Sequence, residues 1–181
     1  DDSDAPDDDR DVFVMVGDGS YLMMAQELVT AVQEGVKLIV VIVQNHGFAS
    51  IGALSESLGS QRFGTRYRFR TDTGIDGGLL PVDLGANAAS LGADVLRASD
   101  IAEFEKAIAA AQAASITTVV HVETDPLVPG PDSPAWWDVP VAEVSALDST
   151  RAARATYEAA KAGQRHHLAP SEVSPQKDEE S

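Results

Sequence analysis

Two short clusters of glycine and polar residues contain the side chains best suited to chemistry. Gly17-Asp18-Gly19 follows one apolar run, and Asn45-His46-Gly47 follows a second. A carboxylate oxygen, an amide oxygen and a nearby backbone carbonyl are the hard ligands that Mg²⁺ prefers, often together with phosphate oxygens. The glycines around Asp18 also let the backbone turn sharply and approach a ligand closely. These residue types predict a divalent cation between Asp18 and Asn45.

Both clusters are expected at the carboxyl ends of neighbouring strands. Residues 11–16 and 37–44 are apolar runs typical of buried strands, and apolar residues recur at helical spacing over 20–34. A helix of about fifteen residues covers roughly 22 Å at 1.5 Å per residue. Six or seven strand residues then return about 20 Å. Asp18 and Asn45 are therefore predicted to converge at one edge of a sheet.

The start of the predicted helix is suited to an anion. Ser20 is a typical N-cap residue, and Gly35 is a typical helix stop. A helix N-terminus directs free N–H groups and a partial positive charge at a ligand. Together with the cation, it predicts a metal-bridged diphosphate. The competing interpretation is a plain strand-to-helix turn capped by Asp18, with a second plain turn after residue 44.

The alternation of strands and helices continues along the chain. Helices are expected over residues 50–58, 81–91, 101–114 and 149–162, strands over 93–97 and 116–123, and a long surface loop over 59–78. Asp100 is the expected cap of the third helix. This order predicts an α/β fold, a doubly wound and mostly parallel sheet with helices on both faces.

The domain organisation follows from composition. Residues 1–10 and 164–181 are acidic or polar and are expected to be disordered. Residues 11–124 are expected to form the α/β domain with the predicted cation and diphosphate site. Residues 125–163 are expected to be a Pro- and Trp-rich extension with a C-terminal helix.

The overall charge limits the choice of partners. The 181 residues have a formal net charge of −16, which would repel nucleic acid and anionic membranes. No apolar run approaches the ~18 residues of a membrane span. The sequence has no cysteine, which suits a cytoplasmic enzyme. We therefore expect a cytoplasmic protein with a small-molecule ligand.

The spacing of the two clusters resembles a known signature. "GDG", 25 intervening residues and then "N" are similar to the cofactor-binding motif of thiamine diphosphate-dependent enzymes. The resemblance implies that Asp18, the Asn45 side chain and the Gly47 carbonyl bind Mg²⁺. It also implies that Gly17, Gly19 and Ser20 line the diphosphate of thiamine diphosphate. Phe48 is expected either to pack against the cofactor or to belong to the core.

Two further segments narrow the resemblance. "YRFR" at residues 67–70 and "SPAWWDVPVAEVS" at residues 133–145 are similar to the C-terminal part of the trihydroxycyclohexane-1,2-dione hydrolases of inositol catabolism. The resemblance covers roughly Asp11 to Gly163. It implies hydrolytic cleavage of a C–C bond in a cyclic 1,2-diketone, giving 5-deoxy-glucuronate, with the cofactor supplying the chemistry.

The same resemblance implies that this chain is only part of the enzyme. Members of the family have a second, pyrimidine-binding domain that supplies the activating Glu, and no segment here is similar to it. We expect that domain elsewhere in a longer protein or on a companion chain. We also expect a homo-oligomer, and an isolated chain that is catalytically incomplete.

Several residues near the predicted site have two interpretations. His46 is either an acid–base catalyst or a half-exposed loop residue. Arg66, Arg68 and Arg70 alternate with aromatic residues, as in an exposed strand; they either contact a substrate or partner or form a solvated edge. Trp136 and Trp137 are expected to anchor an interface rather than to bind a ligand.

Two other functions compete with the hydrolase. The first is a sister enzyme of the same superfamily, either an acetolactate synthase-like carboligase or a 2-oxo acid decarboxylase. The second is an inactive fragment that binds Mg²⁺ and diphosphate or only interacts with a partner. The segments at residues 67–70 and 136–137 favour the hydrolase over the sister enzymes.

Overall fold

The computed structural model describes residues 10–128 and 138–164. The chain divides into two compact units. The first comprises Asp1–Ser57 and Gln61–Asp132, and the second comprises Leu58–Ser60 and Ser133–Ser181. The segments expected to be disordered fall almost entirely outside the described residues, as do Trp136 and Trp137.

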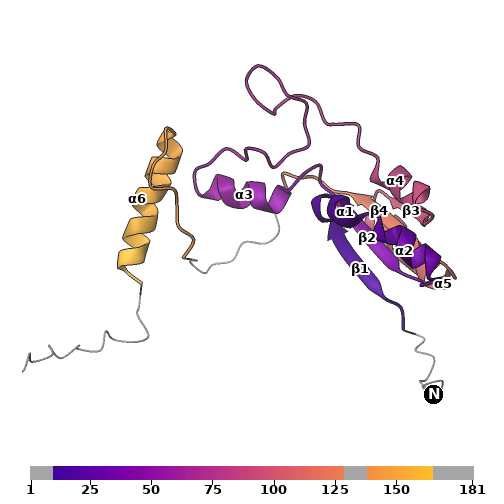
Figure 1. Cartoon of the computed structure of the whole chain (residues 1–181). Coiled ribbons are helices and arrows are strands. Elements are labelled where there is room, and N and C mark those ends of the chain that lie inside the picture. The colour runs from indigo at the N-terminus through magenta and orange to yellow at the C-terminus, as the bar shows by residue number, and fades with distance from the viewer. Residues whose placement is uncertain (1–9, 129–137, 165–181) are drawn as a thin grey trace, which may run out of the picture. The chain divides into compact units, whose positions relative to one another are not determined.

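The first unit is built on a parallel sheet of four strands (Figure 1). Its strands are β1 (Phe13–Gly17), β2 (Ile39–Gln44), β3 (Asp94–Ala98) and β4 (Thr118–Glu123). They lie in the order β1-β2-β4-β3, and every pairing is parallel. Crossover helices must therefore connect the strands. The predicted α/β fold is confirmed.

Helices pack on both faces of this sheet. On one face, α1 (Asp18–Met24), α2 (Glu27–Gln33) and α4 (Leu84–Ser90) cover β2 and β4, and Tyr21, Leu28 and Leu84 form the core there. On the other face, α5 (Ile101–Ala113) packs its alanines against the same two strands. β2 is buried along most of its length because it is central to the sheet.

The single helix predicted over 20–34 is wrong in two respects. The helix begins at Asp18, with Gly17 in the extended N-cap position, so Ser20 lies inside the first turn and is not the cap. The helix is also divided into α1 and α2. Leu28 N–H donates to the Ala25 carbonyl and Val29 N–H to the Gln26 carbonyl. These bonds to the third preceding residue tighten the turn and separate the two helices.

The other predicted elements lie within a few residues of their expected bounds. Asp100 caps α5 as expected, because its carboxylate accepts a hydrogen bond from the Glu103 N–H at 2.8 Å. The expected helix 81–91 is shorter, since α4 begins after Asp83, whose side chain accepts from Ala86 N–H. The helix α3 (Ala49–Ser57) follows the second polar cluster.

The long loop after α3 has no regular helix or strand, as predicted, but it is not detached from the sheet. Arg66 pairs with Gly47, and Arg68 pairs with Leu79, in isolated antiparallel bridges. The exposed strand expected from the alternation of Arg66, Arg68 and Arg70 is wrong. Each bridge is one residue pair long, so the segment lacks the continuous ladder that a strand requires.

The second unit contains α6 (Asp148–Ala162), which confirms the helix expected at 149–162. Ser149 and Thr150 both donate side-chain hydrogen bonds to the Gly59 carbonyl, at 2.7 and 2.8 Å. Gly59 has φ +82°, and a Cβ there would lie 2.5 Å from the Ser149 carbonyl oxygen, so this position requires glycine. None of the described helices is long and apolar enough to cross a membrane.

Candidate cofactor-binding site

Asp18 lies at the carboxyl edge of the sheet and is only 1% exposed. The register pairs Gly17 with Val43, so the residues that follow both strands lie at the same level. The Asp18 Oδ2 atom accepts hydrogen bonds from the backbone N–H groups of Asn45, at 3.1 Å, and Gly47, at 3.0 Å. Its Oδ1 atom accepts from Gly19 N–H at 2.9 Å. The structure thus brings Asp18, Asn45 and Gly47 together.

The hydrogen-bond donors of the Asp18 carboxylate are all neutral. The three groups that donate to it are backbone N–H groups, which carry no net charge. A buried carboxylate is costly unless a cation or several hydrogen bonds compensate it. Hydrogen bonds are present here, but a compensating positive charge is not among them. A cation at this position would supply the missing charge.

Asn45 provides an unsatisfied oxygen. Its Oδ1 atom is buried and has no hydrogen-bond partner, and it is the one such side-chain atom within the described residues. Buried polar atoms are nearly always paired, so an orphaned acceptor indicates a missing ligand or ion. An amide oxygen next to a buried carboxylate fits a hard cation. The residues present therefore fit Mg²⁺.

The site does not depend on a cluster of acidic or imidazole ligands. No group of three or more His, Cys, Asp or Glu side chains in the described part of the chain could hold a metal ion. A cation beside Asp18 would have to use the Asn45 amide, a backbone carbonyl and oxygens of its own ligand. That mixed set is typical of Mg²⁺ bound to a phosphorylated molecule.

The loop after β2 has an unusual backbone. His46 has φ +59° and Gly47 has φ +154°. A Cβ at Gly47 would lie 2.2 Å from the Thr65 carbonyl oxygen, so only glycine fits. Phe48 N–H donates to the Thr65 carbonyl, and Tyr67 N–H donates to the His46 carbonyl, both at 2.8 Å. The segment around residue 66 therefore fastens the loop in place.

Phe48 connects the two polar clusters. A Cβ at Gly19 would lie 2.3 Å from the Phe48 ring, so the ring occupies the space left by that glycine. The Phe48 ring also meets the Tyr67 ring edge to face, with centroids 5.9 Å apart. Gly17 and Ser20, in contrast, are exposed, and no atom lies within 4 Å of a Cβ built at Gly17. The start of α1 is open to a ligand.

Tyr67 lies beside the site, although the sequence singled it out only as part of the alternating segment at residues 66–70. Burial and then the negative charge of Asp18 raise its pKa above the ordinary value. Arg66 and Arg68 line a small hollow together with Asn45 and His46, whereas Arg70 is exposed outside it. The alternation of aromatic and basic residues is the one sequence signal that could have located Tyr67.

His46 lies at one end of a line of polar side chains whose centre is buried. Its Nδ1 atom is 3.2 Å from Gln44 Nε2, and its Nε2 atom is 3.6 Å from a Glu123 carboxylate oxygen. Gln44 Oε1 is in turn 2.7 Å from His121 Nε2, and His121 Nδ1 is 3.2 Å from Arg97. The connection of His121 with Gln44 and Arg97 was not predicted from the sequence.

His121 is held neutral by its surroundings. Burial lowers its pKa most, and the neighbouring Arg97 charge lowers it further, while the Glu123 and Asp83 carboxylates act in the opposite direction. A neutral imidazole can accept a hydrogen bond at one nitrogen and donate at the other. Both nitrogens of His121 have such partners.

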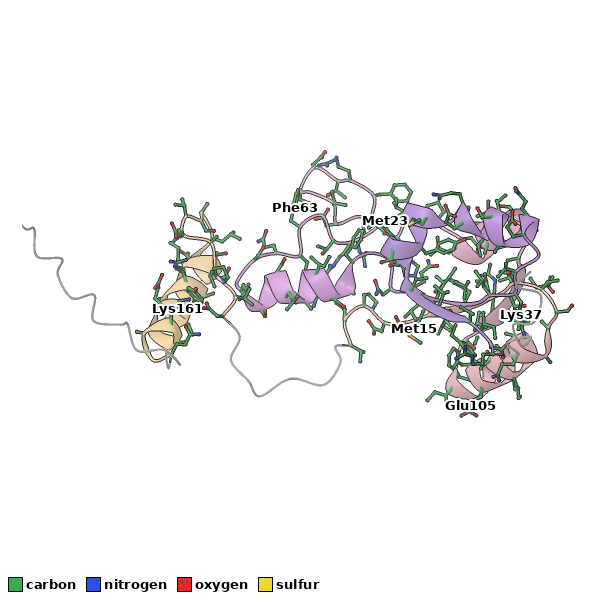
Figure 2. The ribbon with its side chains drawn as sticks, turned by 60° about the horizontal axis from the view of Figure 1, so that its bottom comes forward. Met15, Met23, Lys37, Phe63, Glu105 and Lys161 are labelled. Carbon is green, nitrogen blue, oxygen red and sulfur yellow. The ribbon has the colours of Figure 1, made fainter. Side chains whose placement is uncertain are left out.

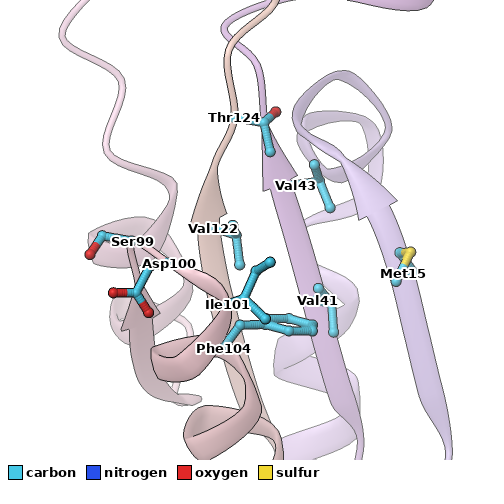
Figure 3. Close-up of a pocket in the computed structure, with 9 residues that line it drawn as sticks. All are labelled: Met15, Val41, Val43, Ser99, Asp100, Ile101, Phe104, Val122 and Thr124. Atoms are coloured by element: carbon cyan, nitrogen blue, oxygen red, sulfur yellow. The ribbon is translucent and has the colours of Figure 1, made fainter. Parts of the chain in front are cut away.

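Two of the hollows beside the sheet have different linings. A hollow of about 990 Å³ lies between α3 and the segment after β4, and its lining includes Asn45, Ser50 and Arg62. A smaller and almost wholly apolar hollow of about 300 Å³ lies on the α5 face of the sheet, where Phe104 faces Val41 and Met15 lies on the neighbouring strand (Figure 3). Of these two, only the larger hollow reaches Asn45.

The fold and these residues match a family of cofactor-binding domains. The family described as "Thiamine pyrophosphate enzyme, C-terminal TPP binding domain" matches residues 4–122. The chain therefore belongs to the thiamine pyrophosphate enzymes, as their C-terminal TPP-binding domain.

Among curated proteins, the chain is similar to the 3D-(3,5/4)-trihydroxycyclohexane-1,2-dione hydrolases. It is 34% identical over 146 residues to the enzyme of Bacillus cereus (strain AH820) and to that of Clostridium perfringens (strain 13 / Type A). Each match covers 80% of this chain and 23% of the relative. The chain thus spans about a quarter of the length of these relatives.

Solved structures show the same fold. Benzoylformate decarboxylase from Polynucleobacter necessarius matches with a TM-score of 0.54 and 23% identity, over 67% of this chain and 21% of that one. The thiamine diphosphate-dependent 4-hydroxybenzoylformate decarboxylase of Rhodococcus jostii RHA1 matches with a TM-score of 0.52 and 24% identity, over 65% and 20%.

Proposed function

We propose that Asp18, the Asn45 side chain and the Gly47 carbonyl hold a Mg²⁺ ion that binds the diphosphate of thiamine diphosphate. The observation that carries this proposal is the orphaned Asn45 Oδ1 atom beside a buried carboxylate whose donors are all neutral. Membership of the TPP-binding family supplies the identity of the phosphorylated ligand.

The start of α1 is the proposed cradle for the diphosphate. Gly17 and Ser20 are exposed there, and Gly17 leaves open space where another residue would place a Cβ. Gly19 lets the Phe48 ring pack directly against the turn, which fixes the turn beside the proposed cation. When bound, the cofactor supplies a carbon nucleophile and an electron sink. The residues described here bind and orient it.

We propose that the complete enzyme hydrolyses a C–C bond of trihydroxycyclohexane-1,2-dione in the inositol catabolism of the cytoplasm. The support is the 34% identity to the hydrolases over 80% of this chain. The hollow of about 990 Å³ beside Asn45 has polar and apolar lining residues, as a polyhydroxylated ring requires. His46 lies between the proposed ligands Asn45 and Gly47 in the chain, and we propose it as the group that exchanges a proton with the substrate.

This chain exposes large apolar side chains that the rest of the enzyme would bury. Met15, Met23 and Phe63, labelled in Figure 2, are 72%, 66% and 77% exposed. The apolar hollow around Met15 and Ile101 has almost no polar lining, which does not suit a diphosphate but suits protein packing (Figure 3). We propose that the pyrimidine-binding domain, with the activating Glu, or a second copy of the subunit packs against such surfaces.

A decarboxylase or carboligase is the second candidate. The two solved structures compared above are decarboxylases by name, but identities of 23% and 24% indicate a shared fold and nothing finer. The hydrolases are more similar in sequence over more of this chain. Incubating the complete enzyme with the cyclic dione and with pyruvate separates the candidates, and consumption of pyruvate alone would overturn the hydrolase assignment.

Titration of the chain with Mg²⁺ and thiamine diphosphate tests the cofactor site. Calorimetry should detect binding that requires both components and that Asp18→Ala abolishes. Because an incomplete site binds weakly, Mn²⁺ offers a second readout: as a paramagnetic substitute it should broaden the amide signals of Asn45 and Gly47 first. Asp94→Ala removes an exposed carboxylate from β3 and is the matched control. Equal binding by the Asp18 and Asp94 variants would refute the site.

A further inference from the structure

Four side chains form a continuous hydrogen-bonded line, here called the relay, from β3 across β4 and β2 to the loop of the cofactor site. They are Arg97, His121, Gln44 and His46. Gln44 is 1% exposed and His121 is 3% exposed, so water does not interrupt the centre of the line. His46 is the end that lies at the candidate site.

The Arg97 end fixes the direction of the hydrogen bonds. A guanidinium group has only donors, so His121 Nδ1, at 3.2 Å from Arg97, must accept. The single proton of neutral His121 is therefore on Nε2. That N–H donates to Gln44 Oε1 at 2.7 Å.

The backbone fixes the same direction independently. Gln44 Nε2 lies 3.2 Å from the Val82 carbonyl oxygen, which can only accept. The amide is thus oriented with its nitrogen toward Val82 and His46, and its oxygen toward His121. Gln44 Nε2 then donates to His46 Nδ1, at 3.2 Å. His46 Nδ1 accepts, so its proton resides on Nε2.

We propose that Arg97, His121 and Gln44 are positioning residues that hold His46 as its Nε2–H tautomer and aim this N–H at the carboxyl edge of the sheet. Glu123 has a carboxylate oxygen 3.6 Å from His46 Nε2 and steadies the ring from the open side. The left-handed backbone of His46, at φ +59°, turns the side chain back toward the relay. The donor serves a developing negative charge on a substrate oxygen; this use rests on the proposed function, but the tautomer does not.

Nitrogen spectra of the chain without ligands test the tautomer. Long-range ¹H–¹⁵N correlation spectra distinguish a protonated from an unprotonated ring nitrogen in each of the four histidines. His46→Gln and His121→Gln assign the signals. We expect both His46 and His121 to show a protonated Nε2 and an unprotonated Nδ1 near neutral pH. A protonated Nδ1 at His46 would overturn the proposal.

Gln44→Glu tests whether the relay sets that tautomer. A carboxylate accepts from both rings, so the proton of His46 should move to Nδ1, while His121 keeps its Nε2–H. Circular dichroism confirms folding, and Asp83→Asn, which changes only the exposed neighbour of Arg97, should leave both rings unchanged. An unchanged His46 in folded Gln44→Glu would show that the relay does not control it.

The complete enzyme tests the use of the donor. Gln44→Glu should lower kcat by about 100-fold, the lower range of acid–base contributions, and leave KM for the dione nearly unchanged. A shifted tautomer with normal kcat would restrict the relay to a structural role and overturn the donor assignment. Failure of the proposed function would appear elsewhere, as absent binding of Mg²⁺ and thiamine diphosphate by a chain whose tautomers are as expected.

Discussion

Asp18 and His121 are two ionisable residues buried to a similar extent, and they differ in how their surroundings satisfy them. Asp18 is 1% exposed and His121 is 3% exposed. Asp18 receives three backbone N–H groups and no charge, and the neighbouring Asn45 oxygen has no partner. His121 has a side-chain partner at each ring nitrogen. A buried polar group with complete partners stabilises the fold, whereas one that lacks a charge or a partner is suited to an external ligand.

Removing either of two adjacent amide side chains, Asn45 or Gln44, should have very different effects on stability. Asn45→Ala removes an acceptor without a partner, so the free energy of unfolding should change by less than about 1 kcal/mol. Gln44→Ala leaves His121 Nε2 and His46 Nδ1 without partners and should cost about 3 kcal/mol. Urea unfolding of both variants measures the difference.

The order of these two variants should reverse when cation binding is measured instead of stability. Asn45→Ala should lower the affinity for Mn²⁺ with thiamine diphosphate about 100-fold or more, because it removes a proposed ligand. Gln44→Ala should affect it less, through the position of the loop. Equal Mn²⁺ affinities for wild type and Asn45→Ala would contradict the proposed role of the Asn45 side chain as a metal ligand.

Alanine substitutions at Gly47 and Gly19 should also differ in how much they destabilise the fold. Gly47→Ala places a Cβ 2.2 Å from the Thr65 carbonyl at φ +154°, so a backbone must move, and the cost should be about 3 kcal/mol. Gly19→Ala meets the Phe48 ring at 2.3 Å, and the ring can turn away, so the cost should be about 1 kcal/mol.

Thermal or urea unfolding ranks the two glycine variants. The fluorescence or ring NMR signals of Phe48 and Tyr67 should change in Gly19→Ala but not in a Gly35→Ala control in the turn after α2, where no atom lies within 4 Å of the new Cβ. Because Gly35 itself has φ +64°, that control still includes the backbone strain alone. A larger cost for Gly19→Ala than for Gly47→Ala would contradict the stated order.

The sequence predicted the part of the site that depends on strand ends. Apolar runs of fixed length around a helical segment set the level at which Asp18 and Asn45 emerge, and local pattern is enough to locate them. The predicted start of α1 was wrong because Gly17, which has no capping side chain, occupies the N-cap position. Local preference placed the cap at Ser20, where a side chain could have supplied the hydrogen bond.

The relay could not be predicted in the same way. Gln44, His121 and Arg97 come from three strands, and their contact depends on the order β1-β2-β4-β3, which brings sequence-distant strands side by side. Register pairs Ile42 with His121 and His121 with Arg97, so the chain of contacts is a property of the sheet. Likewise, Tyr67 reaches Phe48 only through isolated bridges that have no periodic signal.

The neutral state of His121 predicts how stability depends on pH. Burial and the Arg97 charge lower its pKa in the folded chain, outweighing the Asp83 and Glu123 carboxylates, and His46 also lowers it. The unfolded chain therefore binds the proton first as the pH falls below about 6.5, the ordinary histidine value. The free energy of unfolding should fall below that pH, by up to about 1.4 kcal/mol per pH unit.

Urea unfolding between pH 7.5 and 5 measures this slope, and His121→Gln should flatten it. The carboxylates whose pKa is lowered by hydrogen bonds, such as Glu103 and Asp138, stabilise the fold above their unfolded values and lose that contribution only as the pH falls further. They therefore do not contribute in this window. The same slope in His121→Gln would assign the pH dependence to other groups.

The smallest effect on stability is expected for Asp83, which lies beside the Arg97 end of the relay. Asp83 pairs with Arg97, but both side chains are about half exposed, so the ion pair should contribute no more than about 0.5 kcal/mol. Asp83 also caps α4 through the Ala86 N–H, which lowers the pKa of Asp83 more than Arg97 does. Asp83→Asn retains a capping oxygen and should be nearly neutral, whereas Asp83→Ala should cost about 1 kcal/mol more. If Asp83→Asn were as costly as Asp83→Ala, the ion pair rather than the cap would anchor Arg97, and the relay would extend to the protein surface.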